Sequence, residues 1–176
     1  DWGAKIKIYC DRYKEPVIIE PGIRELGDYG MIRPLAATHG TWGKTLQVTR
    51  HLSKIVPKHT PYLQTIFSPA TTLKKLTSNR LIQDMVEHPE EVHKALRAIT
   101  DTPISFVQAN IEAGVSGFFF AIQTATYDFM TDVLYAEFCK PYDLEVINSY
   151  KDKTWFNVVH IHGSNSMYDT VSKYPC

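Results

Sequence analysis

The stretch Gly117-Phe118-Phe119-Phe120-Ala121-Ile122 is the longest apolar run in this 176-residue sequence. A short, continuously apolar run of this kind is typical of a strand buried on both faces, as in a parallel sheet. Residues 62–67, before it, and residues 155–161, after it, are also rich in β-branched and aromatic side chains. The sequence therefore predicts three strands, at residues 62–67, 118–122 and 155–161.

Helical patterns separate these strands. Proline suits the first turn of a helix, and glycine is a common helix stop. Strands that alternate with helices predict an α/β fold with a parallel sheet. The expected helices are residues 72–86, with a break near Ser78-Asn79; residues 89–113, kinked at Pro103; residues 131–147, bent at Pro141; and a short helix over residues 167–173.

The first third of the chain is less regular. Residues 5–9 and 16–20 alternate like short strands, and residues 44–55 have helical spacing that ends before Pro57. We expect one domain over residues 1–176, with an irregular part at 1–60 and regular βα units at 61–176. A complete eight-stranded (β/α)8 barrel needs about 250 residues. The chain is therefore either a small open doubly wound sheet or part of a barrel.

The composition excludes several classes of protein. Nineteen Lys and Arg balance nineteen Asp and Glu, so the chain has no excess of cations for binding phosphates and no nucleic-acid partner is expected. The apolar runs are too short to cross a bilayer, so no membrane association is expected either. Cys10, Cys139 and Cys176 are an odd, scattered set. They argue against a disulfide framework and favour a reducing, cytoplasmic location.

The sharpest local motif is His160-Ile161-His162-Gly163, at the end of the third expected strand. Residues i and i+2 of a strand point to the same side, and active sites of parallel α/β folds lie at the carboxyl ends of strands. Neutral imidazole is a common zinc ligand, so His160 and His162 are candidate metal ligands. The alternative is that these histidines only bond neighbouring backbone.

Four other polar residues stand at or near predicted strand ends. Ser68, Gln123 and Thr124 follow strands directly, and Asp128 lies a few residues further on. They are candidate pocket residues, while the alternative is that they only shape turns or, for Asp128, a helix entry. The sequence identifies no catalytic residue.

Several short motifs occur in an order that resembles the uroporphyrinogen decarboxylase superfamily. This group contains porphyrinogen decarboxylases and zinc-dependent, corrinoid-linked methyltransferases. The resemblance implies a (β/α)8 TIM-type barrel, of which this chain would be an interior portion. The motifs are residues 67–73 (FSPATTL), 111–115 (IEAGV), 138–142 (FCKPY) and 159–163 (VHIHG).

The two branches of this superfamily differ in the residues that they have at these positions. Methyltransferases resembling the chain have His-x-Cys-Gly where this sequence has His160-Ile161-His162-Gly163, so His162 replaces a thiolate and makes the site less soft. Their further cysteine ligand would lie beyond Cys176. Decarboxylases have Asp-Ser where this chain has Gln123-Thr124, and a tyrosine near the position of Leu76. Both departures count against porphyrinogen decarboxylation.

The first hypothesis is therefore a zinc-dependent, methyltransferase-like protein that moves a methyl group from a corrinoid to a thiol. The alternative is a uroporphyrinogen III decarboxylase of porphyrin and haem biosynthesis, a lyase that needs no cofactor. A third hypothesis is a non-catalytic truncated barrel. The full-length protein is expected to be an enzyme, while activity of this chain alone stays open. Expected partners are a small thiol or tetrapyrrole, a corrinoid protein, and a second copy of the chain.

Overall fold

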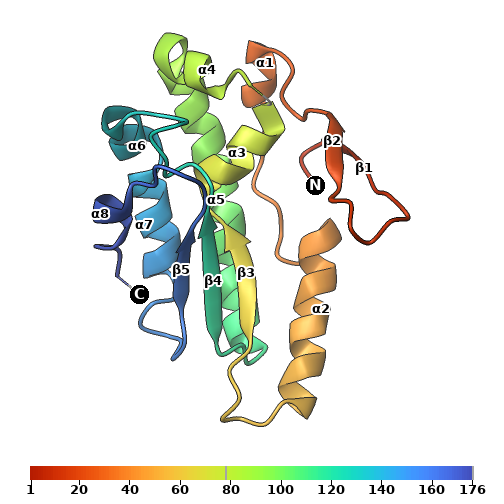
Figure 1. Cartoon of the computed structure of the whole chain (residues 1–176). Helices are drawn as coiled ribbons and strands as arrows, with labels where there is room; N and C mark the ends of the chain where they lie inside the picture. Colours follow the sequence, from red (N-terminus) through yellow and green to blue (C-terminus); the bar gives the residue numbers. More distant parts are fainter. Residues whose placement is uncertain (78, 176) are drawn as a thin grey trace.

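A computed structural model describes residues 1–77 and 79–175. Ser78, where a helix break is predicted, and Cys176 lie outside the described residues. Figure 1 shows an α/β arrangement in which helices accompany a small central sheet. No helix in the described parts of the chain is long and apolar enough to span a membrane.

The central sheet consists of the three strands that the sequence predicts. They are β3 (Leu63–Phe67), β4 (Gly117–Ile122) and β5 (Val158–Ile161), in the order β3-β4-β5. Both pairings are parallel, with Phe67 opposite Ala121 and Ile122 opposite Ile161. The predicted parallel α/β class is confirmed, and the carboxyl ends of all three strands meet at one edge of the sheet.

In residues 63–77 and 79–175, six helices connect and follow these strands. The 24-residue helix α5 begins with Pro89 in its first turn and continues through Pro103. Gly114, after its end, has φ +93°, a conformation that favours glycine. The bounds are α3 (Pro69–Thr77), α4 (Leu81–Glu87), α5 (Pro89–Glu112), α6 (Asp132–Phe138), α7 (Lys140–Asn148) and α8 (Tyr168–Val171).

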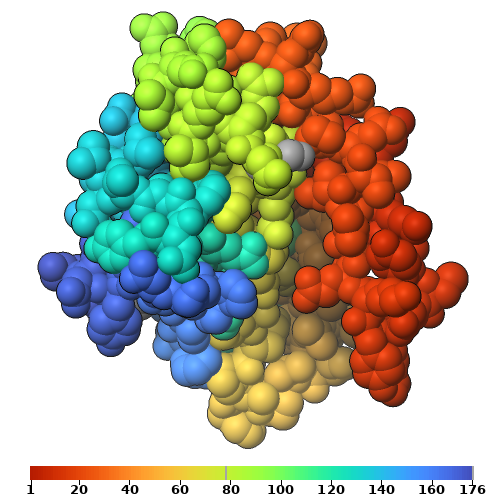
Figure 2. Space-filling model, turned by 45° about the horizontal axis from the view of Figure 1, so that its top comes forward, coloured from red at the N-terminus to blue at the C-terminus, as the bar shows by residue number. Residues whose placement is uncertain are grey.

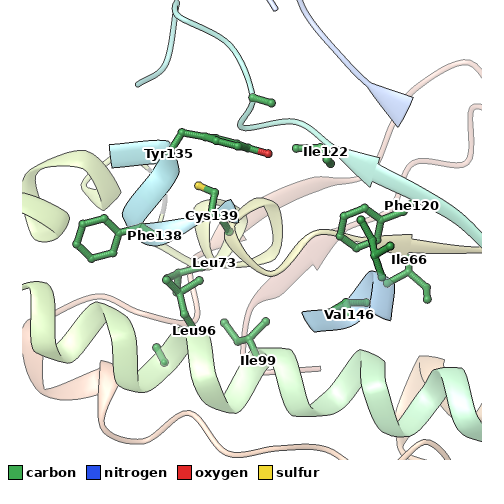
Figure 3. Close-up of a cluster of buried hydrophobic side chains, with 14 of the residues drawn as sticks. Ile66, Leu73, Leu96, Ile99, Phe120, Ile122, Tyr135, Phe138, Cys139 and Val146 are labelled. Carbon is green, nitrogen blue, oxygen red and sulfur yellow. The ribbon is translucent and has the colours of Figure 1, made fainter. Parts of the chain in front are cut away.

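One face of the sheet packs against helices. Phe118, Phe120 and Ile122 alternate along β4 and are completely buried, as is Ile66 on β3. Figure 3 shows Phe120 and Ile66 beside Val146 of α7, with Leu96 and Ile99 of α5 lining the same core. Burial of these large apolar side chains is the main favourable contribution to folding, about 1.5–3 kcal/mol for each.

The opposite face of the sheet is open. Thr65 is exposed and Phe67 is 40% exposed on β3, and Phe119 on the middle strand β4 is only partly buried. Figure 1 shows no helix in front of β3, β4 and β5 on this face. The sequence predicts that the apolar run at 117–122 is buried on both faces. In the structure, helices cover only one of these faces.

The N-terminal part forms a hairpin and two helices. Strands β1 (Lys5–Lys7) and β2 (Val17–Glu20) pair antiparallel, and α1 (Leu26–Tyr29) and α2 (Gly40–Ile55) follow. Specific contacts attach this part: the Ile23 N–H donates to the carbonyl of Leu76 (2.9 Å), and the rings of Trp42 and Phe106 lie 4.7 Å apart. The predicted strands and the helix ending at Ile55 are confirmed.

A cavity of about 400 Å³ separates this N-terminal part from the edge strand β3. Its lining is largely apolar and includes Trp2, Ile6, Trp42, Phe67 and Phe106. Figure 2 shows the corresponding hollow between the red N-terminal segment and the yellow-green segment. Because its lining residues come from distant parts of the sequence, the cavity was not predictable from local patterns.

Several element boundaries differ from the predicted ones, and α2 and α3 begin three to four residues earlier, at Gly40 and Pro69. The helix expected over 131–147 is divided at Cys139, because Pro141 in the first turn of α7 has no N–H to continue the ladder. The strand expected from Trp155 begins only at Val158. Before it, the N–H groups of Trp155 and Phe156 both donate to the Ser116 carbonyl, which turns the chain toward β5.

A buried carboxyl lies among the helices beneath β4. The Asp143 side chain is fully buried, and its Oδ2 accepts hydrogen bonds from Tyr135 (2.9 Å) and Tyr174 (3.3 Å). Its Oδ1 has no hydrogen-bond partner among the described residues. Burial raises the pKa of Asp143 from 3.8 to about 7, although the two tyrosine hydroxyls oppose the shift. Burial and the nearby carboxylate likewise raise the pKa of the Cys139 thiol.

Replacing this carboxyl should change how stability depends on pH. A raised pKa means that the folded protein holds the proton more tightly than the unfolded chain. The protonated Asp143 therefore contributes fully to the free energy of unfolding below about pH 4. This contribution is lost as the pH rises to about 7, and the loss is up to about 4 kcal/mol. We expect Asp143→Asn to gain stability relative to the parent protein between pH 5 and pH 8, as measured by denaturant unfolding of the full-length protein. Asp152→Asn, at a side chain 83% exposed, is the control. An equal effect of Asp143→Asn at both pH values would contradict the assignment.

The outer strands lead to a second prediction. In the described parts of the chain, β3 and β5 each pair on one side only. Unpaired strand edges with an uncovered apolar face favour association. We expect the isolated 1–176 polypeptide to be oligomeric or to aggregate in multi-angle light scattering. A monodisperse monomer at micromolar concentration would count against this expectation.

Candidate functional site

The carboxyl ends of the three central strands form the candidate site. Two backbone hydrogen bonds extend the sheet beyond the strands: the Ser68 N–H donates to the carbonyl of Ala121 (3.0 Å), and the His162 N–H donates to that of Ile122 (3.1 Å). Residues after β3, β4 and β5 are therefore held at one edge, as Figure 1 shows for the three connecting loops. This is the edge where parallel α/β enzymes bind substrate.

His160 and His162 lie on the same side of the chain, as the sequence predicts. His160 is opposite Ala121 in the register, and its ring stacks against Phe119 with centroids 5.2 Å apart. It is partly buried, whereas His162 is exposed. The two imidazole centroids are 6.1 Å apart. Because Phe119 belongs to the uncovered side of the sheet, the imidazole stacked on it also lies on that side.

The spacing of the two rings is compatible with a shared metal ion. Two imidazoles on one tetrahedral zinc have ring centres roughly 5 Å apart, given Zn–N bonds of about 2.0–2.1 Å. A small rotation of the exposed His162 ring would close the difference. Within residues 1–77 and 79–175, however, no group of three or more His, Cys, Asp or Glu side chains is arranged to hold a metal. The pair fits as two ligands of a zinc site, which needs at least one more.

Three of the candidate pocket residues have structural contacts. The Ser68 hydroxyl is fully buried and donates to the Thr71 hydroxyl (2.7 Å). Thr71 also accepts the Gln123 N–H (2.9 Å), so it joins the ends of β3 and β4. Thr124 is fully buried, with its hydroxyl beside the Cys139 thiol. Of these three residues, only Gln123 is partly exposed at the edge.

The structure brings Asp128 close to the segment that follows His162. Asp128 is exposed, and its carboxylate accepts hydrogen bonds from the Ser164 hydroxyl (2.7 Å) and the Asn165 amide (3.3 Å). Thr126, which the sequence did not single out, donates from its hydroxyl to the Ser164 carbonyl (2.6 Å). In the sequence, the only indication of these contacts was that polar residues follow neighbouring strands.

Lys74 is a second residue that the sequence reasoning missed. Its ammonium lies 3.7 Å from the centroid of the Phe129 ring, in the segment between β4 and α6. Burial, and then the charge of Lys75, lower the pKa of Lys74. Lys74 therefore joins α3 to this segment by a cation–π contact, and no spacing pattern in the sequence indicates the pairing.

Comparisons with known proteins agree with this architecture. A family model described as uroporphyrinogen decarboxylase (URO-D) matches residues 2–176. Methylcobamide:CoM methyltransferase MtbA from Methanosarcina mazei is 21% identical over 165 residues, covering 94% of this chain and 48% of the relative. The protein of the same name from Methanosarcina acetivorans is 20% identical, with the same coverage.

The solved structure of a methyltransferase from Methanosarcina mazei has a similar fold. Its TM-score is 0.73 at 18% identity, covering 93% of this chain and 48% of that one. The chain thus spans about half the length of the curated relatives it matches. This likeness confirms an α/β fold of the TIM-barrel type, with part of the barrel in this chain. Since the family model matches nearly every residue, the chain belongs to the uroporphyrinogen decarboxylase family.

Proposed function

We propose that the full-length protein transfers a methyl group from a corrinoid to a small thiol, with zinc held in part by His160 and His162. The observation that carries the proposal is this imidazole pair, with rings 6.1 Å apart at the carboxyl edge of the sheet. The names of the two curated relatives, which are methylcobamide:CoM methyltransferases, support the choice of donor and reaction.

The protein's own residues have distinct roles in this proposal. His160 and His162 bind as neutral imidazoles, each through a nitrogen lone pair. Phe119 stacks on His160 and limits the rotation of its ring. Its apolar surface also reduces water access on that side, which strengthens electrostatic interactions. The remaining one or two ligands would come from residues outside the described chain or from the bound thiol.

Zinc at this position would supply a Lewis acid that favours the thiolate form of a bound thiol at neutral pH. The thiol proton passes to solvent, and the sulfur forms a bond to the methyl carbon. The corrinoid would act as the methyl donor, and the electron pair of its carbon–cobalt bond would stay with the corrinoid. With His162 in place of a cysteine ligand, the protein would contribute less negative charge to the site, and a zinc ion held there would be a stronger acceptor for the substrate sulfur.

Removal of both imidazoles tests the metal site. We expect the full-length protein to bind about one zinc per chain, and His160→Ala with His162→Ala to weaken zinc binding by more than about a hundredfold. Loss of a residue that only hydrogen-bonds to a metal ligand weakens metal binding about 10–100-fold. Loss of the two ligands themselves should therefore weaken it more. Zinc content and competition against a chromophoric chelator measure this. His59→Ala, at an exposed histidine in another loop, is the matched control.

Two results would contradict the proposal. One is the absence of stoichiometric zinc in the full-length protein, or equal zinc affinity in the double variant and the parent. The other is metal-free release of CO2 from uroporphyrinogen, which would favour the decarboxylase alternative. Methyl transfer from methylcobamide to a thiol, lost in the double variant and kept in His59→Ala, would support it.

A cysteine at the second ligand position gives an independent test. Thiolate is a softer ligand than imidazole, so His162→Cys should bind Cd²⁺ more tightly relative to Zn²⁺ than the parent protein does. We expect the Cd²⁺/Zn²⁺ affinity ratio to rise at least about tenfold, measured by metal competition. The same substitution at His59 should leave the ratio unchanged. An unchanged ratio in His162→Cys would mean that residue 162 is not a ligand.

A further inference from the structure

The segment after His162 has an unusual backbone. Gly163 has φ +115° and Asn165 has φ +52°. A positive φ is uncommon for a residue other than glycine, and such conformations persist when surrounding contacts fix them. Residues 163–166 are therefore a shaped connection, and the contacts that fix them also determine how the chain leaves His162.

Those contacts come from the segment between β4 and α6. The Asn165 carbonyl accepts the Tyr127 N–H (3.0 Å), while the Asn165 side-chain amide donates to Asp128 (3.3 Å). The Ser164 hydroxyl donates to Asp128 (2.7 Å), and its carbonyl accepts the Thr126 hydroxyl (2.6 Å). Two side chains thus bind both Ser164 and Asn165: the Thr126 hydroxyl donates to their carbonyls, and the Asp128 carboxylate accepts from their side chains.

His162 depends on this connection for its orientation. Its N–H is fixed to the Ile122 carbonyl on one side and its side chain is exposed, whereas the His160 ring is partly buried and stacks on Phe119. Next to it, Gly163 allows rotation that other residues would restrict. The direction of the His162 ring therefore depends on the backbone of residues 163–166, which Asp128 holds together with Thr126 and the Tyr127 N–H.

We infer that Asp128 is a positioning residue that aims His162 toward the metal site, and not a residue that contacts substrate. The inference rests on the proposed function for the metal itself. The geometric part, that Asp128 controls the His162 ring, does not depend on the metal. Two acceptor oxygens are required, because Oδ2 serves Ser164 and Oδ1 serves Asn165.

The test compares variants of the full-length protein in two measurements. The first is the ¹H–¹⁵N spectrum of the His160 and His162 imidazoles without metal, and the second is the affinity for Zn²⁺ alone. We expect Asp128→Ala to change the His162 signals and to leave those of His160 unchanged. It should also weaken Zn²⁺ binding about tenfold, as the loss of a residue that orients a metal ligand does. Asp128→Asn keeps one acceptor oxygen and should recover part of the affinity.

Ser164→Ala removes only the 2.7 Å bond to Asp128 and should change both measurements in the same direction. It replaces Asp128→Ala in the test if that variant fails to fold. Combined with Asp128→Ala it should add little, because the two substitutions remove the same bond. Tyr127→Phe is the matched control: it removes the bond from Tyr127 to Asp132 (3.0 Å) and leaves the bonds of Asp128 intact. It should change neither measurement.

The outcomes separate the positioning role from a structural role. A lower melting temperature in Asp128→Ala and Ser164→Ala, with unchanged His162 signals and Zn²⁺ affinity, would overturn the inference. If the parent protein binds no Zn²⁺, the proposed function fails and the metal-free spectra decide alone. A selective change at His162 would then sustain the positioning role of Asp128, and equal changes at both histidines or at neither would overturn it.

Discussion

Parallel pairing of β4 with a strand on each side determines the position of every residue at the candidate site. The pairs Phe67 with Ala121 and Ile122 with Ile161 bring three strand ends to one edge. A shift of β5 by one residue would move His160 and His162 to the helix-covered face, since side chains alternate along a strand. On that face Phe118 and Phe120 of β4 are completely buried, so the shift would place both imidazoles against the apolar core.

This pairing also separates two environments across the sheet. On one face, apolar side chains and the buried Asp143 pack among helices α5, α6 and α7. Figure 3 shows Cys139 between Tyr135 and Leu73 there, with the Tyr135 hydroxyl directed toward Ile122. On the other face, Phe119 and His160 stack without helices above them. In a TIM-type barrel the face opposite the helices is turned inward, so we expect the His160 ring to face the interior of the complete barrel.

The sequence predicted the elements well, because apolar runs and prolines act locally. Residues 117–122 and Pro89 indicated β4 and the start of α5 without knowledge of the rest of the chain. The contacts between loops were not predictable, since Asp128 and Ser164 are 36 positions apart and neither has a distinctive pattern. The burial of Asp143 was equally hidden, because an aspartate in the first turn of a helix is usually solvated at the positive end of the helix.

The segment from Thr124 to Met130 connects these environments, and its two ends are held in different ways. Thr124 and Ala125 are buried at its start, and at its end the Met130 sulfur accepts a hydrogen bond from the Cys139 thiol (3.5 Å). Between these anchors, the Asp128 carboxylate accepts hydrogen bonds from Ser164 and Asn165 of the chain after β5. The Thr126 hydroxyl donates to the carbonyls of the same two residues and accepts the Asp128 N–H. Because the anchors lie in the core, loss of the Asp128 carboxylate leaves them in place. Its effect therefore passes to residues 163–166, and from there to His162.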